Sequence, residues 1–213
     1  MALPGMPHKR LKRELQPRIP PMTRRALGTL RIIGGEWRSR LIEFDAAAGV
    51  RPTPDRVRQT LFDWLSPLIA GASCLDLFAG SGALGFEALS RGAAHASLIE
   101  QGREQATAMR AAAIKLAAGE RAEIVQTEAL SWLRSTARRY DVVFLDPPYG
   151  ADLLAPALAA MPRVLKGMHR VYLEWPQGQP PQWPAGYTLL KEKSAGQVSY
   201  GLAVFSAAAP AQA

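Results

Sequence analysis

The sequence lacks the residues from which disulfide frameworks and structural zinc sites are built. It contains one cysteine, Cys74, and three histidines, and these form neither a Cys-x-x-Cys pair nor a histidine cluster. An internal disulfide is therefore excluded, and the composition gives no signal for a structural metal. We expect Cys74 to be a small buried residue in a protein of a reducing compartment that needs no metal ion.

Long hydrophobic runs are also missing. No window approaches about 18 consecutive apolar residues, and the N-terminus lacks the apolar segment of a secretory signal. The 213 residues are nevertheless 48% hydrophobic, which is enough to bury one sizeable core. We expect a cytoplasmic monomer with no membrane partner, built from one α/β domain and an appendage.

Acidic residues are scarce at the N-terminus. The first 40 residues contain ten Lys or Arg against Glu14 and Glu36, so this segment accounts for the whole net charge of +8. A basic segment on a neutral body is typical of proteins that bind a polyanion, nucleic acid first. Residues 1–28 also contain five prolines, and we predict a disordered basic arm there and a disordered tail at 206–213. A solvated arm without a partner, a misassigned start codon and a transit peptide are the alternatives.

The stretch from Cys74 to Gly85 reads C-L-D-L-F-A-G-S-G-A-L-G, which predicts a buried strand, a tight loop and the start of a helix. Gly80 and Gly82 permit positive φ and a close approach of the backbone to a ligand. The free N–H groups at the start of the helix favour an anionic or strongly polar cofactor.

Two cofactors are compatible with this loop. Its glycines match the dinucleotide pattern G-x-G-x-x-G, and Glu100 ends the next strand at the ribose-binding spacing, as in a nicotinamide dehydrogenase. Asp76 favours a different cofactor, because a carboxylate inside an apolar strand needs a cationic or hydrogen-bonding partner. The amino group of S-adenosylmethionine (SAM) would supply one. Alternatively, Asp76 caps a loop or binds backbone amides.

A second chemical motif ends a later strand. Residues 140–145 are an apolar run that leads into Asp146, Pro147, Pro148 and Tyr149. The prolines stiffen the loop, so the Asp146 carboxylate and the Pro147 carbonyl become two fixed acceptors beside an aromatic ring. An exocyclic amine on a flat base has two N–H donors and a ring to stack. A rigid turn in which the aspartate caps a helix is the structural alternative.

Arginines gather in two places before the glycine loop. Two β-like runs flank Gly34-Gly35, which predicts a hairpin over residues 29–45, with basic and aromatic side chains near its turn. Thr53 can cap a helix that begins at Pro54, and the arginines at this helix start conflict with the helix dipole unless an external anion binds. We predict RNA contacts, or packing in the case of the hairpin, for Arg31, Trp37, Arg38, Arg40, Arg51, Arg56 and Arg58.

From Ser73 onward, strand and helix patterns alternate as in a doubly wound α/β sheet. We expect one domain over residues 29–205. The predicted strands are 73–78, 96–100, 122–126, 140–145 and 170–175, the predicted helices are 82–91, 103–118, 128–138 and 151–165, and the runs 187–193 and 197–205 are expected to pair antiparallel.

Several motifs occur in a characteristic order: R-I-I-G-G-x-W-R-x-R, R-P-T-x-D-R-V-R-x-T-L-F-x-W-L, L-D-x-F-A-G-S-G-A-L-G, D-P-P-Y and A-G-Q-V-x-Y. With them, residues 30–205 resemble the class I SAM-dependent amino-methyltransferases, and within that class the bacterial 16S rRNA guanine-N2 methyltransferases. The chain departs from this pattern at Gln59, where the family has Glu, and at Glu128-Ala129, where an Asp or Asn is usual.

The resemblance implies a Rossmann-like, mostly parallel sheet with a reversed last strand, SAM as methyl donor, and guanine N2 of 16S rRNA as target in ribosome biogenesis. The substrate is expected to be the rRNA or an assembly intermediate of the small subunit. Cofactor contacts are predicted at Thr53, Asp76, Phe78, Gly80, Gly82, Glu100, Glu128 and Ala129, and acceptor contacts at Asp146, Pro147 and Tyr149. Methylation of adenine N6 and an inactive rRNA-binding module are the alternatives.

Overall fold

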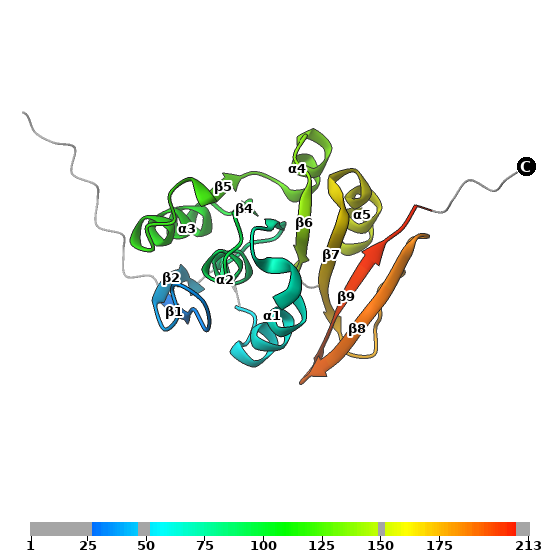
Figure 1. The fold of residues 1–213 in the computed structure, drawn as a ribbon, viewed down its shortest axis with the longest axis horizontal. Helices are drawn as coiled ribbons and strands as arrows, with labels where there is room; N and C mark the ends of the chain where they lie inside the picture. Colours follow the sequence, from blue (N-terminus) through cyan, green and yellow to red (C-terminus); the bar gives the residue numbers. More distant parts are fainter. Residues whose placement is uncertain (1–26, 47–51, 149–151, 208–213) are drawn as a thin grey trace, which may run out of the picture.

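The computed structural model describes residues 27–46, 52–148 and 152–207. A seven-stranded sheet runs through the molecule (Figure 1). In spatial order its strands are β5 (Ala122–Gln126), β4 (His95–Glu100), β3 (Ser73–Asp76), β6 (Tyr140–Leu145), β7 (Leu165–Pro176), β9 (Val198–Phe205) and β8 (Tyr187–Ala195). The first five strands are mutually parallel, whereas β9 runs antiparallel to both β7 and β8. The predicted doubly wound sheet with a reversed last strand is confirmed.

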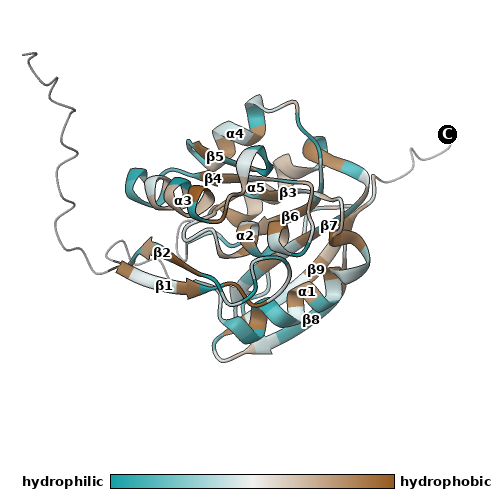
Figure 2. Cartoon of the chain, turned by 60° about the vertical axis from the view of Figure 1, so that its left-hand side comes forward, coloured by the Kyte–Doolittle hydropathy of each residue, from teal (hydrophilic) through white to brown (hydrophobic). Residues whose placement is uncertain are grey.

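The central strands are apolar throughout because helices cover both faces of the sheet. In β6, Val142 and Phe144 belong to one core cluster and Val143 and Leu145 to the other. The first cluster lies under α1 (Asp55–Ile69), α2 (Ala83–Ser90) and α3 (Arg103–Lys115), and the second under α4 (Ala129–Ser135) and α5 (Leu154–Ala160). Figure 2 shows hydrophobic stretches along the central strands and hydrophilic ones on the outer turns of the helices. Cys74 is fully buried in the first cluster, as predicted.

Several element boundaries differ from the predicted ones. β3 ends at Asp76, two residues early, and α3 and α4 each end three residues early. The predicted helix 151–165 is divided between α5 and a 3-10 helix, η3 (Met161–Val164), because Pro162 supplies no backbone N–H to continue the α-helix. A second 3-10 helix, η2 (Gly119–Arg121), precedes β5. β7 begins five residues before the prediction, where the three exposed residues Lys166, Gly167 and Met168 interrupt the alternation expected of a strand.

The predicted N-terminal hairpin is present. β1 (Leu27–Arg31) pairs antiparallel with β2 (Leu41–Asp45) in a separate two-stranded sheet, with Leu30 opposite Ile42. Its connection is longer than a Gly-Gly turn and occupies residues 32–40. Gly35 is required in this loop, because its φ is +74° and a Cβ there would collide with the carbonyl of Ser90 in α2. The hairpin therefore packs closely on the main domain, where β2 also contacts α3.

Most of the predicted arm and tail, residues 1–26 and 208–213, lies outside the described residues. Within the described ranges, no helix combines the length and the apolar character needed to cross a membrane.

Candidate active site

A cavity of about 680 Å³ opens where β3, β4 and β6 end. Parallel strands present their carboxyl ends at one edge of a sheet, so segments far apart in the sequence meet there. Of the predicted cofactor and acceptor residues, the cavity is lined by Thr53, Asp76, Phe78, Gly80, Glu100, Glu128, Ala129, Asp146 and Pro147. Gly82 is not in the lining, and Tyr149 lies outside the described residues.

The glycine loop after β3 has the predicted backbone geometry. Gly80 and Gly82 have φ of +50° and +76°. Gly82 is the N-cap of α2, and a Cβ at this position would lie 2.6 Å from the ring of Phe86. Gly82 therefore shapes the turn from behind, whereas Gly80 faces the cavity.

Asp76 is the last residue of β3 and is 3% exposed. Its Oδ2 accepts a hydrogen bond of 3.0 Å from the amide of Gly85 in α2. Burial raises the pKa of Asp76 to about 7, partly offset by the Gly85 bond, and the charge of Glu100 raises it further. Asp76 thus binds a backbone amide, as one interpretation held. Its raised pKa also means that a cationic group bound in the cavity would stabilise the ionised carboxylate.

Glu100 joins the two loops on this side of the cavity. Its Oε2 accepts from the Gly80 amide at 2.9 Å and its Oε1 from the Gly102 amide at 2.6 Å. The sequence indicated only a contact with ribose, whereas the structure adds this role in holding the glycine loop. Each carboxylate oxygen retains a second lone pair that can accept from a hydroxyl of a ligand.

Glu128 lines the cavity and is the N-cap of α4. Its carboxylate accepts from the amides of Leu130 and Ser131 at 2.8 and 2.7 Å, and the Leu130 bond is the main cause that lowers the pKa of Glu128. The predicted helix start at this residue is thereby accounted for. Ala129 follows as the first helical residue and is buried.

Asp146 and Pro147 follow β6, the neighbour of β3 in the sheet, and line the same cavity as the glycine loop. Burial raises the pKa of Asp146 well above its usual value, and the nearby carboxyls of Glu174 and Asp76 raise it further. A hydrogen bond with Thr53 acts in the opposite direction. The ionised form of Asp146 therefore depends on a cationic group or water in the cavity that stabilises its charge.

Thr53 does not cap α1, which corrects the prediction. The N-cap is Pro54, and it makes no side-chain capping bond. The Thr53 side chain is instead 6% exposed and hydrogen-bonds to the carboxyls of both Asp146 and Glu174. A capping role was inferred from local spacing, whereas these two partners lie far away in the sequence.

Glu174 was missed by the sequence analysis. It lies in β7, is 7% exposed, and accepts a hydrogen bond of 2.7 Å from the hydroxyl of Tyr172. The signal that could have found it is the one used for Asp76, namely an acidic residue inside an otherwise apolar strand.

Trp37 corrects the predicted set of RNA contacts. It is 2% exposed, and its amide donates to the hydroxyl of Ser90 at 2.9 Å. The guanidinium of Arg121 lies over its ring, 5.0 Å from the centroid. The indole therefore packs in the core and is closed to a stacking base, which is the alternative that the sequence left open.

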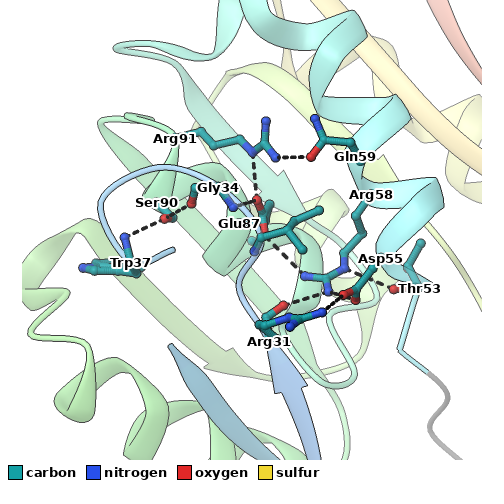
Figure 3. Close-up of polar contacts among 12 residues, drawn as sticks. Arg31, Gly34, Trp37, Thr53, Asp55, Arg58, Gln59, Glu87, Ser90 and Arg91 are labelled. Carbon is teal, nitrogen blue, oxygen red and sulfur yellow. Dashed lines mark hydrogen bonds and ion pairs between the residues drawn. The ribbon is translucent and has the colours of Figure 1, made fainter. Parts of the chain in front are cut away.

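Arg58 is a second correction, because it is fully buried and salt-bridged. Its Nη1 lies 3.3 Å from Oε2 of Glu87, and its Nη2 lies 2.6 Å from Oδ1 of Asp55 and donates to the carbonyl of Arg31 at 2.8 Å (Figure 3). The conflict between arginine and helix dipole is thus relieved by internal carboxylates, and no external anion is needed at Arg58.

Glu87 connects the hairpin loop to α1 and α2. Its two oxygens accept from the amides of Ile33 and Gly34, each at 2.9 Å, and Oε1 also accepts from Nε of Arg91 at 2.7 Å (Figure 3). The arginines that remain exposed among the predicted RNA contacts are Arg31, Arg38, Arg40 and Arg56, while Arg51 lies outside the described residues.

Comparison with known proteins gives a consistent set of relatives. Residues 30–204 match the protein family described as Conserved hypothetical protein 95. Over 178 residues the chain is 44% identical to Ribosomal RNA small subunit methyltransferase D of Escherichia coli (strain K12), covering 82% of this chain and 89% of that protein. The Haemophilus influenzae (strain ATCC 51907 / DSM 11121 / KW20 / Rd) protein of the same name is 41% identical over 185 residues, covering 84% and 96%.

Solved structures agree with this result. The structure described as putative methyltransferase yhhF from Escherichia coli superposes with a TM-score of 0.76 at 43% identity, covering 84% of this chain and 99% of that one.

Proposed function

Because this chain belongs to the family described as Conserved hypothetical protein 95, we propose that it transfers a methyl group from SAM to the N2 amine of a guanine in 16S ribosomal RNA. One observation carries this proposal. The glycine loop with Asp76 and the loop with Asp146 and Pro147, which are 70 positions apart in the sequence, line a single cavity. A methyl donor and an acceptor amine can therefore meet in it.

The donor side of the cavity fits SAM. The buried Asp76 carboxylate would pair with the ammonium group, and the free lone pairs of Glu100 would accept from the ribose hydroxyls. Phe78, Glu128 and Ala129 complete the wall for the adenine. SAM, when bound, supplies an electrophilic methyl group on its sulfonium.

The acceptor side acts on the amine of the base. Asp146 and the Pro147 carbonyl accept hydrogen bonds from the two N–H groups of the amine. These bonds bend the hydrogens out of the ring plane, which frees the conjugated nitrogen lone pair for attack. Since the amine becomes cationic as the new N–C bond forms, the Asp146 carboxylate stabilises the transition state more than the ground state. The proton then leaves the methylated amine to Asp146. Tyr149, outside the described residues, is proposed to stack on the flipped base.

RNA recruitment is assigned to exposed cations. Arg31, Arg38 and Arg40 on the hairpin and Arg56 at the start of α1 are solvent-exposed and can contact phosphates, with Arg51 and the basic arm as further candidates. We propose the 16S rRNA, or an assembly intermediate of the small subunit, as the cytoplasmic substrate.

Mapping of the modified nucleotide tests the function directly. Ribosomal RNA from a strain lacking this protein should miss one N2-methylguanosine, and the wild-type gene should restore it, whereas Asp146→Ala should not. Nucleoside analysis also separates guanine N2 from adenine N6 as the target. An unchanged methylation pattern in the deletion strain would refute the proposal.

A further inference from the structure

Building on the proposed methyl transfer, we propose that Glu174 is a positioning residue that remains protonated and, through Thr53, orients the Asp146 carboxylate toward the acceptor amine. Glu174 would donate to Thr53 as a carboxylic acid, and Thr53 would donate to Asp146. Asp146 would then face the amine as the charged member of the pair.

Tyr172 supplies the first link of this chain. Tyr172 and Glu174 point to the same face of β7, and both are almost fully buried, at 0% and 7% exposure. The Tyr172 hydroxyl donates to Oε1 of Glu174 at 2.7 Å. A phenol has one hydrogen to donate, so this bond fixes the direction of the chain at its buried end.

Thr53 supplies the second link, and its position is set by its backbone. The Nε of the buried Arg58 donates to the Thr53 carbonyl at 3.1 Å, and Arg58 is itself held by Asp55 and Glu87 (Figure 3). The Thr53 side chain hydrogen-bonds to both Asp146 and Glu174. The hydroxyl is therefore fixed between the Asp146 carboxyl, which follows β6, and the Glu174 carboxyl inside β7.

Counting hydrogens then determines the charge state. The Thr53 hydroxyl has one hydrogen, so it can donate to only one of its two carboxyl partners at a time. Two ionised carboxylates would share that hydrogen and repel each other in a poorly solvated site. One proton on the pair removes this conflict, because the protonated acid then donates to the Thr53 oxygen.

Exposure decides which carboxyl keeps the proton. Glu174 is 7% exposed, whereas Asp146 is more open and lines the cavity, where water or a cationic amine can stabilise its charge. The titratable groups around the pair are Asp76 from β3, Tyr172 from β7 and Tyr200 from β9. None of these is a cation. Burial raises the pKa of both Asp146 and Glu174, and for Asp146 the nearby carboxyls of Glu174 and Asp76 add to the shift.

A carboxyl NMR titration tests the proton assignment without any measurement of activity. In protein labelled with ¹³C at the glutamate carboxyl carbon, one resonance should stay in its protonated position at pH values where the other glutamates have ionised. This resonance should disappear in Glu174→Gln and persist in the matched variant Glu192→Gln, which changes an exposed residue of β8. A Glu174 resonance that titrates with the other glutamates would overturn the proposal.

Kinetics test the positioning role. Single-turnover methyl transfer at saturating SAM should be about tenfold slower in Glu174→Leu, which has no donor for Thr53, with SAM affinity unchanged. Glu174→Gln should recover most of this loss, because its amide N–H donates as the acid O–H does. Equal rates for the Gln and Leu variants, or a Leu variant as fast as the wild type, would contradict the proposal.

Folding and function are checked separately. Each variant is compared by thermal unfolding, and Tyr172→Phe, which removes only the hydroxyl, serves if Glu174→Leu does not fold. Tyr172→Phe should change the pH at which the Glu174 resonance titrates, and it should slow methyl transfer as Glu174→Leu does. A wild-type protein that does not methylate rRNA would refute the proposed function, while the NMR titration would still decide the protonation of Glu174.

Discussion

The chemistry of the cavity depends on carboxyl groups whose charge is sensitive to what binds beside them. Asp76 is the clearest case. Burial raises its pKa to about 7, and the hydrogen-bond donor that it binds, the amide of Gly85, is neutral. A bound ammonium would favour the ionised form and pull the pKa down again. Ligand binding and proton release are therefore expected to be linked at this residue.

SAM binding should become tighter as the pH rises toward 7. Below its pKa the free protein holds Asp76 protonated, so binding must release that proton, and affinity should fall by up to about tenfold per pH unit. Above pH 7 the dependence should flatten. Calorimetric titration in buffers of different ionisation enthalpy measures both affinity and proton release.

Asp76→Asn provides the control for this prediction. It should bind SAM at least about tenfold more weakly at pH 8 and lose the Asp76 part of the pH dependence. The ammonium of SAM titrates equally with both proteins, so the difference between them isolates Asp76. Identical pH profiles for the two proteins would exclude a pairing of Asp76 with the cofactor.

Asp146 should separate methyl transfer from cofactor binding. Asp146→Ala is expected to lower the single-turnover rate by about a hundredfold or more and to leave SAM affinity nearly unchanged, because its interaction strengthens only as the amine becomes cationic. Asp146→Asn should retain partial activity, since its carbonyl still accepts a hydrogen bond. Wild-type transfer by the Ala variant would remove this loop from the acceptor site.

At the scale of elements, the hairpin and α1 are held to α2 by one buried charge. Glu87 is fully buried and accepts from two hairpin amides and two arginines. Arg58 extends this network to the carbonyl of Thr53, which itself lines the cavity. The arrangement of the hairpin and the acceptor side of the active site are thus connected through Arg58.

Glu87→Leu should destabilise the whole domain. Loss of the carboxylate leaves Nη1 of the buried Arg58 and two hairpin amides without their acceptor, and breaking a buried ion pair costs about 3 to 5 kcal/mol. Urea denaturation followed by circular dichroism measures the free energy of unfolding. Glu43→Leu, at an exposed site on β2, is the matched control and should change it by less than about 1 kcal/mol. Equal stability of the two variants would show that the Glu87 network does not hold the hairpin.

At the scale of the whole molecule, the excess positive charge and the proposed active site lie in different parts of the chain. The excess of basic residues lies in the first 40 positions, whereas the described residues that line the cavity include several carboxyls and no Lys or Arg. Electrostatic attraction for RNA is therefore expected to come from the arm and the exposed face of the hairpin, and specificity for the methylated amine from the cavity.

Deletion of residues 1–26 should weaken RNA affinity and reduce its salt dependence, because seven basic residues leave together with only Glu14. Each lost phosphate contact should lower the slope of log affinity against log salt by roughly 0.7 to 0.9. SAM affinity should not change, which calorimetry checks. An unaltered slope, measured by fluorescence anisotropy across a salt series, would show that the arm does not contact RNA.

The amino-acid sequence by itself determined the alternating elements, the antiparallel pairing of the last two strands and the two loops that line the cavity, while the reversed direction of the last strand in the sheet was implied by the family resemblance. These features are local, since an apolar strand that ends in Gly80 or in Asp146 carries its signal within about ten residues. Element ends were less certain. The start of β7, for example, is set by the pairing of Leu165 with Tyr140 of β6 and not by a strand pattern in its own sequence.

Only the tertiary structure decided which charged and aromatic side chains are free to act. Trp37 and Arg58 are of the residue types that bind RNA, but both are buried. Trp37 hydrogen-bonds to Ser90, and Arg58 forms ion pairs with Glu87 and Asp55. Ser90 and Glu87 lie on a different element from the residues that they bind. Glu174 joins Asp146 only because β7 lies beside β6 in the sheet. Hydrogen-bond pairing and burial depend on contacts across the fold, and for that reason local sequence patterns could not assign these roles.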